Sequence, residues 1–175
     1  LVLGIINSVY YDLYNGFMHE SCVGYKKGIG VSKIAKEVSN NIVKNTYTGY
    51  KVDLSKYFDT VNRETLDATL KRFSTGSAID QIIWDYYHDD LILNEFNELE
   101  THYKSLAQGC AVAAFLANVT IRDIDDEISR MVPVYYRYSD DILIIGPNAE
   151  KAVQRLEVML REKGLKLNPK KIERL

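Results

Sequence analysis

The stretch PVYYRYSDDILIIG, residues 133–146, gives the clearest indication of how this chain folds. Aromatic and β-branched residues on both sides are typical of half-buried strands, yet Asp140 and Asp141 lie between them with neither Gly nor Asn to form an ordinary tight turn. A surface turn is one interpretation, because Asp is common in turns. The apolar flanks favour a hairpin with a charged tip instead. Adjacent carboxylates near a buried surface repel each other unless a cation compensates them, and Mg²⁺ prefers such hard oxygen ligands.

The composition is that of a globular chain. With 175 residues, 46% of them hydrophobic, it can bury a core as one domain or one domain with a small annex. The net charge of −2 and the pI of about 6.0 exclude a dominant basic surface, so any affinity for nucleic acid must come from local patches. Cys22 and Cys110 do not make a disulfide framework or a zinc site, which favours a reducing, cytoplasmic location. No stretch approaches the ~20 apolar residues of a membrane span, so no membrane partner is expected.

Hydrophobic periodicity predicts the order of the remaining elements. Helices are expected where apolar residues recur at helical spacing: 1–18, a segment capped by Ser32, 63–73, 78–87, 111–131, and a segment that Asn148 caps and Gly164 ends. Extended segments are expected at 50–54, at 165–168 and, as a hairpin, over 91–106. This order predicts an α+β fold, in which an antiparallel sheet carries helices on one face.

A third carboxylate is expected near the aspartate pair. Asp53 ends the short strand YKVD and precedes LSKYFD, where the chain turns toward the next helix. Three carboxylates at strand ends can hold two metal ions about 3.5–4 Å apart, an arrangement that serves in-line phosphoryl displacement. An aspartate beside a strand is more often a cap or a solvated residue, so Asp53 alone does not decide between these interpretations.

Five segments together resemble the motifs of reverse transcriptases, and they occur in that family's order. YSDD at 138–141 resembles the Tyr-x-Asp-Asp signature, and DLSKYFD at 53–59 resembles the first palm motif. The other three are GYKKGIG at 24–30, LAQGCAVAAFLAN at 106–118 and GLKLNPKKIE at 164–173. The resemblance is to bacterial reverse transcriptases of the group II intron, retron and diversity-generating kind.

This resemblance implies the fingers–palm core of a polymerase. Residues 1–48 would form part of the fingers and residues 49–175 the palm, with a fingers-like helical and hairpin segment over about 74–106. The basic N-terminal fingers strand and the thumb are not expected in these 175 residues. Because much of the phosphate contact comes from those regions, the isolated fragment is expected to grip duplex weakly.

The resemblance also implies roles for the carboxylates and their neighbours. Asp53, Asp140 and Asp141 would hold two Mg²⁺ ions, which Mn²⁺ can replace, and the backbone carbonyl of Leu54 would add an oxygen ligand. Lys171 would protonate the departing pyrophosphate as a general acid; its alternative is a solvated lysine. Asp59 is expected to cap the helix that follows it, and Arg137 to support the hairpin or a phosphate.

Five further positions would contact the substrate. Phe58, five residues after Asp53, would pack under the sugar and leave no room for a 2′-hydroxyl. Gln108 would donate to the nucleotide, and Gly109 would let the backbone approach it closely. Lys26 and Lys27 would neutralise charge on the template or triphosphate. The family's Ser-Pro after the Gln-Gly turn is replaced by Ala113-Ala114, which marks a divergent member.

The expected function is therefore RNA-directed DNA polymerisation: the transfer of deoxynucleotides from dNTPs to the 3′-hydroxyl of a DNA or RNA primer on an RNA template. One alternative is an RNA-dependent RNA polymerase, although such enzymes usually place Gly before Asp-Asp and lack the bulky aromatic after the first aspartate. The other is an inactive palm that binds nucleic acid or protein. The oligomeric state and the biological role are left open.

Overall fold

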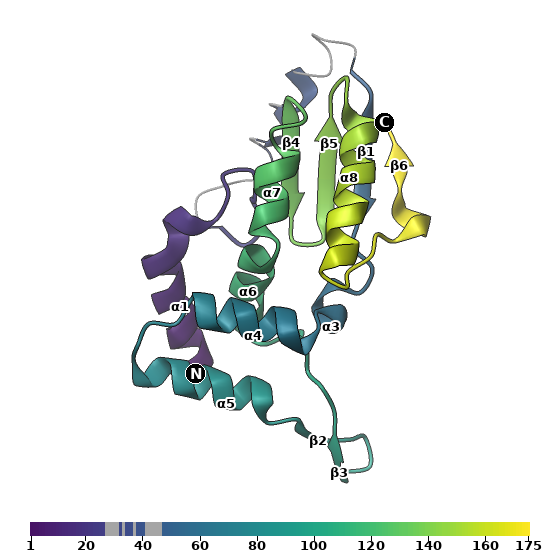
Figure 1. Ribbon diagram of the computed structural model, residues 1–175. Helices are drawn as coiled ribbons and strands as arrows, with labels where there is room; N and C mark the ends of the chain where they lie inside the picture. Colours follow the sequence, from purple (N-terminus) through teal and green to yellow (C-terminus); the bar gives the residue numbers. More distant parts are fainter. Residues whose placement is uncertain (27–31, 33, 37, 41–46) are drawn as a thin grey trace.

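The computed structural model describes residues 1–26, 32, 34–36, 38–40 and 47–175. Its centre is a four-stranded sheet in the order β4-β5-β1-β6, and all neighbouring strands are antiparallel (Figure 1). The strands are β4 (Val134–Tyr138), β5 (Asp141–Ile145), β1 (Gly49–Asp53) and β6 (Glu173–Arg174). The hairpin predicted at 133–146 is therefore present, and the strand predicted at 50–54 is β1.

The two faces of the sheet differ in chemistry because side chains alternate along each strand. Val52, Ile142 and Ile144 are buried in the hydrophobic core on one face. That face is covered by helices, and Figure 1 shows α7 and α8 lying across it. On the opposite face Lys51 and Asp141 are exposed. The predicted α+β fold, with helices packed on one face of an antiparallel sheet, is confirmed.

The predicted helix 111–131 is wrong as a single element, since it divides into α6 (Ala113–Thr120) and α7 (Arg122–Ile128). The break lies at Ile121, whose φ of −115° and ψ of 24° are not helical. The Thr120 hydroxyl donates to the Leu116 carbonyl at 2.7 Å, a side-chain bond that tends to bend helices.

Helix α8 (Ala149–Glu162) ends as predicted but does not begin as predicted. Gly164 has φ of +72°, and the Leu165 N–H donates to the Leu160 carbonyl at 2.8 Å, a C-terminal closure that favours glycine. Asn148 precedes the helix, but its side chain makes no capping hydrogen bond. Its φ of −105° and ψ of 16° are not the extended conformation of a capping residue.

The predicted strand 165–168 is also wrong, because only Leu167 makes a β-bridge there, with Leu54. Asn168 accepts a hydrogen bond from the Lys170 N–H and starts the 3₁₀ turn η2 (Pro169–Lys171). Beyond that turn, β6 pairs with β1 and forms the edge of the sheet.

The remaining helices form a layer at the lower end of the sheet in Figure 1. They are α1 (Val2–Tyr14), the 3₁₀ turn η1 (Asn15–Phe17), α3 (Tyr57–Thr60), α4 (Arg63–Arg72) and α5 (Ala78–His88). Aromatic rings around Phe115 join α1, α4 and α6. The hairpin predicted within 91–106 is present as β2 (Leu91–Leu93) and β3 (Leu99–Thr101). Of the helix predicted after Ser32, residues 34–36 and 38–40 are described and are helical, and the rest lies outside the described residues. In the described part of the chain, no helix is both long and apolar enough to cross a membrane.

Candidate functional site

The aspartates singled out by the sequence meet at one end of the sheet. In the β1–β5 pairing, Asp53 lies directly opposite Asp141, so the two side chains leave the same face. The Leu54 N–H donates to the Asp140 carbonyl at 3.1 Å, which places the tip of the β4–β5 hairpin against the end of β1. Asp53 is buried, with 5% of its surface exposed, whereas Asp141 is open to solvent.

Two lysines compensate the facing carboxylates. The Lys171 ammonium is 2.7 Å from Asp53 Oδ2, and the Lys51 ammonium is 4.0 Å from Asp141 Oδ1. The hydrogen bond to Asp53, together with the charges of Asp53, Asp140 and Asp141, raises the pKa of Lys171 above its ordinary value. The η2 turn therefore brings Lys171 to the Asp53 carboxylate, and its role as a general acid stays a prediction.

The carboxylate end of the sheet has the donor chemistry that a divalent cation requires. Like charges directly opposite each other on neighbouring strands are destabilising, and hard oxygen ligands suit Mg²⁺. Among the described residues, however, no three His, Cys, Asp or Glu side chains are gathered closely enough to hold a metal ion. The backbone positions of the aspartates suit a bound metal ion, whereas the Asp53 carboxylate is hydrogen-bonded to Lys171. The metal-binding role of Asp53, Leu54, Asp140 and Asp141 stays a prediction.

The tip of the β4–β5 hairpin is a two-residue loop with an unusual backbone. Ser139 has φ of 59°, a left-handed conformation without glycine. Residues 21–24 run beside β4. Hydrogen bonds of the Arg137 backbone with Ser21 and Val23 join the two segments. Gly24 touches this loop so closely that a Cβ there would lie 2.7 Å from the Ser139 nitrogen. Gly24, the first residue of the predicted fingers motif, thus packs against the predicted metal-binding tip.

Arg137 is fully buried and forms an ion pair with Asp125 of α7. The prediction that Arg137 supports the hairpin is confirmed, and its alternative role at a phosphate is wrong, because the guanidinium faces the protein interior. Sequence reasoning missed Asp125. A signal existed: Asp125 shares the helical stripe of Ile121, Ile124 and Ile128, where a carboxylate must be buried and paired.

Phe58 and the Gln-Gly turn lie next to each other. The Leu106 N–H donates to the Phe58 carbonyl at 3.0 Å, and the half-buried Phe58 ring meets Tyr57 edge to face. Gln108 and Gly109 are exposed, and Gly109 has φ of +89°. These positions are compatible with the predicted substrate contacts, which stay predictions. Tyr57 lies in the core.

Lys26 makes a structural contact, whereas Asp59 does not have the capping role predicted for it. The Lys26 ammonium donates to the His19 carbonyl at 2.8 Å, and burial lowers its pKa. Asp59 does not cap α4, because the Asn62 side chain accepts the N-terminal hydrogen bond from Thr65. Lys27 lies outside the described residues.

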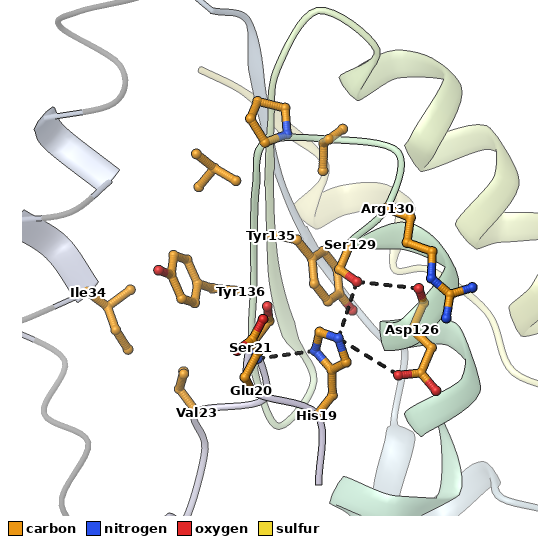
Figure 2. Close-up of a pocket in the computed structure, with 13 residues that line it drawn as sticks. His19, Glu20, Ser21, Val23, Ile34, Asp126, Ser129, Arg130, Tyr135 and Tyr136 are labelled. Atoms are coloured by element: carbon orange, nitrogen blue, oxygen red, sulfur yellow. Dashed lines mark hydrogen bonds and ion pairs between the residues drawn. The ribbon is translucent and has the colours of Figure 1, made fainter.

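A pocket of about 720 Å³ opens beside the first half of β4 (Figure 2). His19 Nδ1 accepts from the Ser21 N–H at 3.1 Å, and Nε2 faces both Ser129 Oγ, at 3.2 Å, and Asp126. In the neutral ring Nε2 therefore carries the hydrogen and cannot take a proton from Ser129. The cluster is not a nucleophile–base pair, and none of the three aspartates at the sheet end lines the pocket.

Comparison with solved structures places this architecture among polymerases. The chain is similar to apo telomerase from Candida tropicalis truncated from its C-terminal domain (TM-score 0.69, 13% identity, covering 99% of this chain and 40% of that one). It is also similar to the RNA-dependent RNA polymerase of a human picobirnavirus (TM-score 0.67, 12% identity, covering 99% of this chain and 34% of that one). A third similar structure is telomerase from Candida albicans in complex with a fragment of telomeric RNA (TM-score 0.61, 11% identity, covering 99% of this chain and 33% of that one). The fold is that of a polymerase palm, and the chain spans less than half of each of these proteins.

The sequence itself carries the family assignment. No match was found among curated proteins. The family model for reverse transcriptase (RNA-dependent DNA polymerase) matches residues 4–175, which is nearly the whole chain. The chain belongs to the reverse transcriptase family.

Proposed function

We propose that this chain is the fingers–palm core of an RNA-directed DNA polymerase that extends a DNA or RNA primer on an RNA template with dNTPs. The observation that carries the proposal is the pairing of Asp53 with Asp141, with Asp140 at the adjoining hairpin tip, in a chain of this family. In this assignment residues 1–48 belong to the fingers and residues 49–175 to the palm. The five motifs favour the bacterial group II intron, retron and diversity-generating kind, acting in the cytoplasm.

The carboxylates would hold the catalytic metals. Asp53, Asp140 and Asp141, with the Leu54 carbonyl, would bind two Mg²⁺ ions, which supply Lewis-acid activation of the primer hydroxyl and neutralise charge on the triphosphate. Lys171 would leave Asp53 when the carboxylates are so occupied and would become available to donate a proton to the leaving pyrophosphate. The 2.7 Å contact between Lys171 and Asp53 supports this, since the ammonium already lies at one of the three carboxylates.

The residues near the β1 end would select the nucleotide. The Phe58 ring would pack under the sugar and exclude a 2′-hydroxyl. Gln108 and Gly109 would contact the sugar and phosphates, and Lys26 and Lys27 would contribute charge near the template. The hydrogen bond between Leu106 and Phe58 supports a shared substrate site, because it joins the two segments that carry these residues.

The test is primer extension by the full-length protein. We expect DNA synthesis on an RNA template with Mg²⁺ and dNTPs, and no synthesis by Asp140→Asn, which keeps the shape of the side chain but not its charge. Asp12→Asn, the same change on exposed α1, is the control and should be fully active. Unchanged activity of Asp140→Asn would disprove the mechanism.

The same assay separates the rival functions. A picobirnavirus RNA-dependent RNA polymerase shares the fold, so extension with ribonucleotides in preference to deoxynucleotides would show that this chain makes RNA. An inactive palm would give no extension. Calorimetric titration with Mn²⁺ would then show no binding that depends on Asp140.

A further inference from the structure

Arg137 is an unusual residue to find with none of its side chain exposed. The cost of removing an arginine and an aspartate from water is several kcal/mol per ion, and it is recovered only when every polar atom finds a good partner. Arg137 lies on the helix-covered face of β4, where it reaches α6 and α7. The groups that accept hydrogen bonds from its guanidinium therefore indicate the role of the buried charge.

The guanidinium divides its donors between the ion pair and the backbone. Nε and Nη2 donate to the two oxygens of Asp125 at 2.7 and 2.6 Å. Nη2 also donates to the Asn118 carbonyl at 2.9 Å. Nη1 points away from Asp125 and donates to the Ser139 carbonyl at 3.2 Å. One arginine thus ties two helices to the loop that carries Asp140.

The contact with Ser139 matters because this residue holds the left-handed φ of 59°. Such a conformation is sterically unfavourable for a non-glycine residue and persists only where the surroundings over-determine it. Arg137 contacts the carbonyl side of Ser139, and Gly24 packs against its nitrogen side. Ser139 is therefore held from two directions, and Asp140 follows it directly in the chain.

Two further buried hydrogen bonds orient the two residues that contact Ser139, namely Arg137 and Gly24. The Tyr135 hydroxyl donates to Asp125 Oδ1 at 2.6 Å, which keeps that carboxylate directed at Arg137. The Asn118 side-chain amide donates to the Gly24 carbonyl at 2.8 Å, which holds Gly24 beside the loop. Apolar residues of similar volume can often replace a buried ion pair without loss of stability, but they cannot donate to the Ser139 carbonyl.

We propose that Arg137 is a positioning residue for the aspartate site: oriented by Asp125, it fixes the Ser139 carbonyl and thereby the direction in which Asp140 is presented beside Asp53. The inference rests on the proposed function, since it concerns the same three carboxylates. It assigns Arg137 no contact with substrate or metal.

The direct test is Arg137→Lys in the full-length protein. Lysine keeps the charge that Asp125 requires, but one ammonium cannot replace the planar fork that spans Asp125 and Ser139. Arg63→Lys is the matched control, because Arg63 also contacts both oxygens of an aspartate, Asp90, and donates to a backbone carbonyl, that of Tyr87. The readouts are kcat and the KM for dNTP in primer extension, and the Kd for Mn²⁺ from calorimetry.

We expect Arg137→Lys to lower kcat about 10- to 100-fold with a nearly unchanged KM for dNTP, and to weaken by a similar factor the Mn²⁺ binding that Asp140→Asn abolishes, as is usual when the support of a metal ligand is lost. Arg63→Lys should change neither kcat nor the affinity for Mn²⁺. If Arg137→Lys lowers only the thermal midpoint and keeps kcat and the Mn²⁺ affinity, Arg137 is merely structural and the inference is wrong.

A second variant covers the case in which Arg137→Lys does not fold. The triple change Asp125→Leu, Tyr135→Phe and Arg137→Met removes the whole buried network without leaving an unpaired charge. We expect it to fold and to show the same losses; full activity would overturn the inference. If the wild type binds Mn²⁺ but does not extend a primer, the proposed function fails while the Mn²⁺ comparison still decides the role of Arg137. If the wild type does neither, both fail.

Discussion

The described part of the chain contains two β-hairpins of similar design in different surroundings. β4–β5 has a two-residue loop, and β2–β3 has a longer one over residues 94–98. Both loops use a non-glycine residue in the left-handed region, Ser139 at φ 59° and Asn97 at φ 60°. Each hairpin is also tied to its surroundings by an arginine–aspartate pair, Arg137 with Asp125 and Arg63 with Asp90.

The difference lies in what surrounds the strands. β4–β5 continues into β1 on one side and is flanked by residues 21–24 on the other. Within the described part of the chain, β2 and β3 pair only with each other, and their large apolar residues are exposed: Leu91, Leu93, Phe96 and Leu99. An isolated two-stranded hairpin is marginally stable. A hairpin tip can therefore present a charged group rigidly only when the sheet and the core hold its strands, as they do for β4–β5.

The largest expected difference between the hairpins concerns activity. Asp141→Asn should lower kcat for primer extension by on the order of 10³, because several kcal/mol of charge stabilisation at the metal site depend on such a carboxylate. Glu95→Gln, the same chemical change in the loop of β2–β3, should leave kcat within about twofold. Steady-state primer extension measures both variants. Equal losses would show that the charged tip of β4–β5 has no special role.

The second expected difference concerns stability. Arg137→Ala leaves Asp125 buried and unpaired, which should lower the free energy of unfolding by about 3–5 kcal/mol. Arg63→Ala removes a pair whose side chains are 32% and 28% exposed, so water can solvate Asp90, and the expected loss is about 1 kcal/mol. Urea unfolding of both variants tests this. A loss for Arg63→Ala as large as that for Arg137→Ala would contradict the assigned burial.

The smallest expected difference concerns the loop backbones. Ser139→Gly removes the steric cost of a left-handed serine but adds chain entropy to the unfolded state, so the net gain in unfolding free energy should be about 0.5 kcal/mol. Asn97→Gly should change stability by less, since asparagine tolerates this conformation better than serine. Thermal unfolding of the two variants side by side measures the difference. A clear loss on Ser139→Gly would mean that the serine side chain itself stabilises the tip.

Local patterns were sufficient to predict much of the fold. Alternation and helical spacing located the β4–β5 hairpin, β1, α4, α5 and α8 because these signals depend on neighbouring residues. The predictions failed at one local feature and at one long-range feature. The bond from Thr120 to Leu116 bends the chain and splits the helix predicted at 111–131, and the strand predicted at 165–168 gave way to a bridge at Leu167 and an edge strand, β6.

At the candidate site, the residue types could be predicted from the motifs alone: three aspartates, a lysine near the C-terminal end of the chain and an aromatic residue after the first aspartate, all in motifs of the reverse transcriptase family. Which of these groups meet depends on the packing of the fold. That packing set Asp53 opposite Asp141, brought Lys171 to Asp53 across 118 residues of sequence, and buried Arg137 against Asp125 beneath the hairpin tip. Spacing along a chain does not encode such contacts, because burial and strand register arise only when the helices and the sheet pack together.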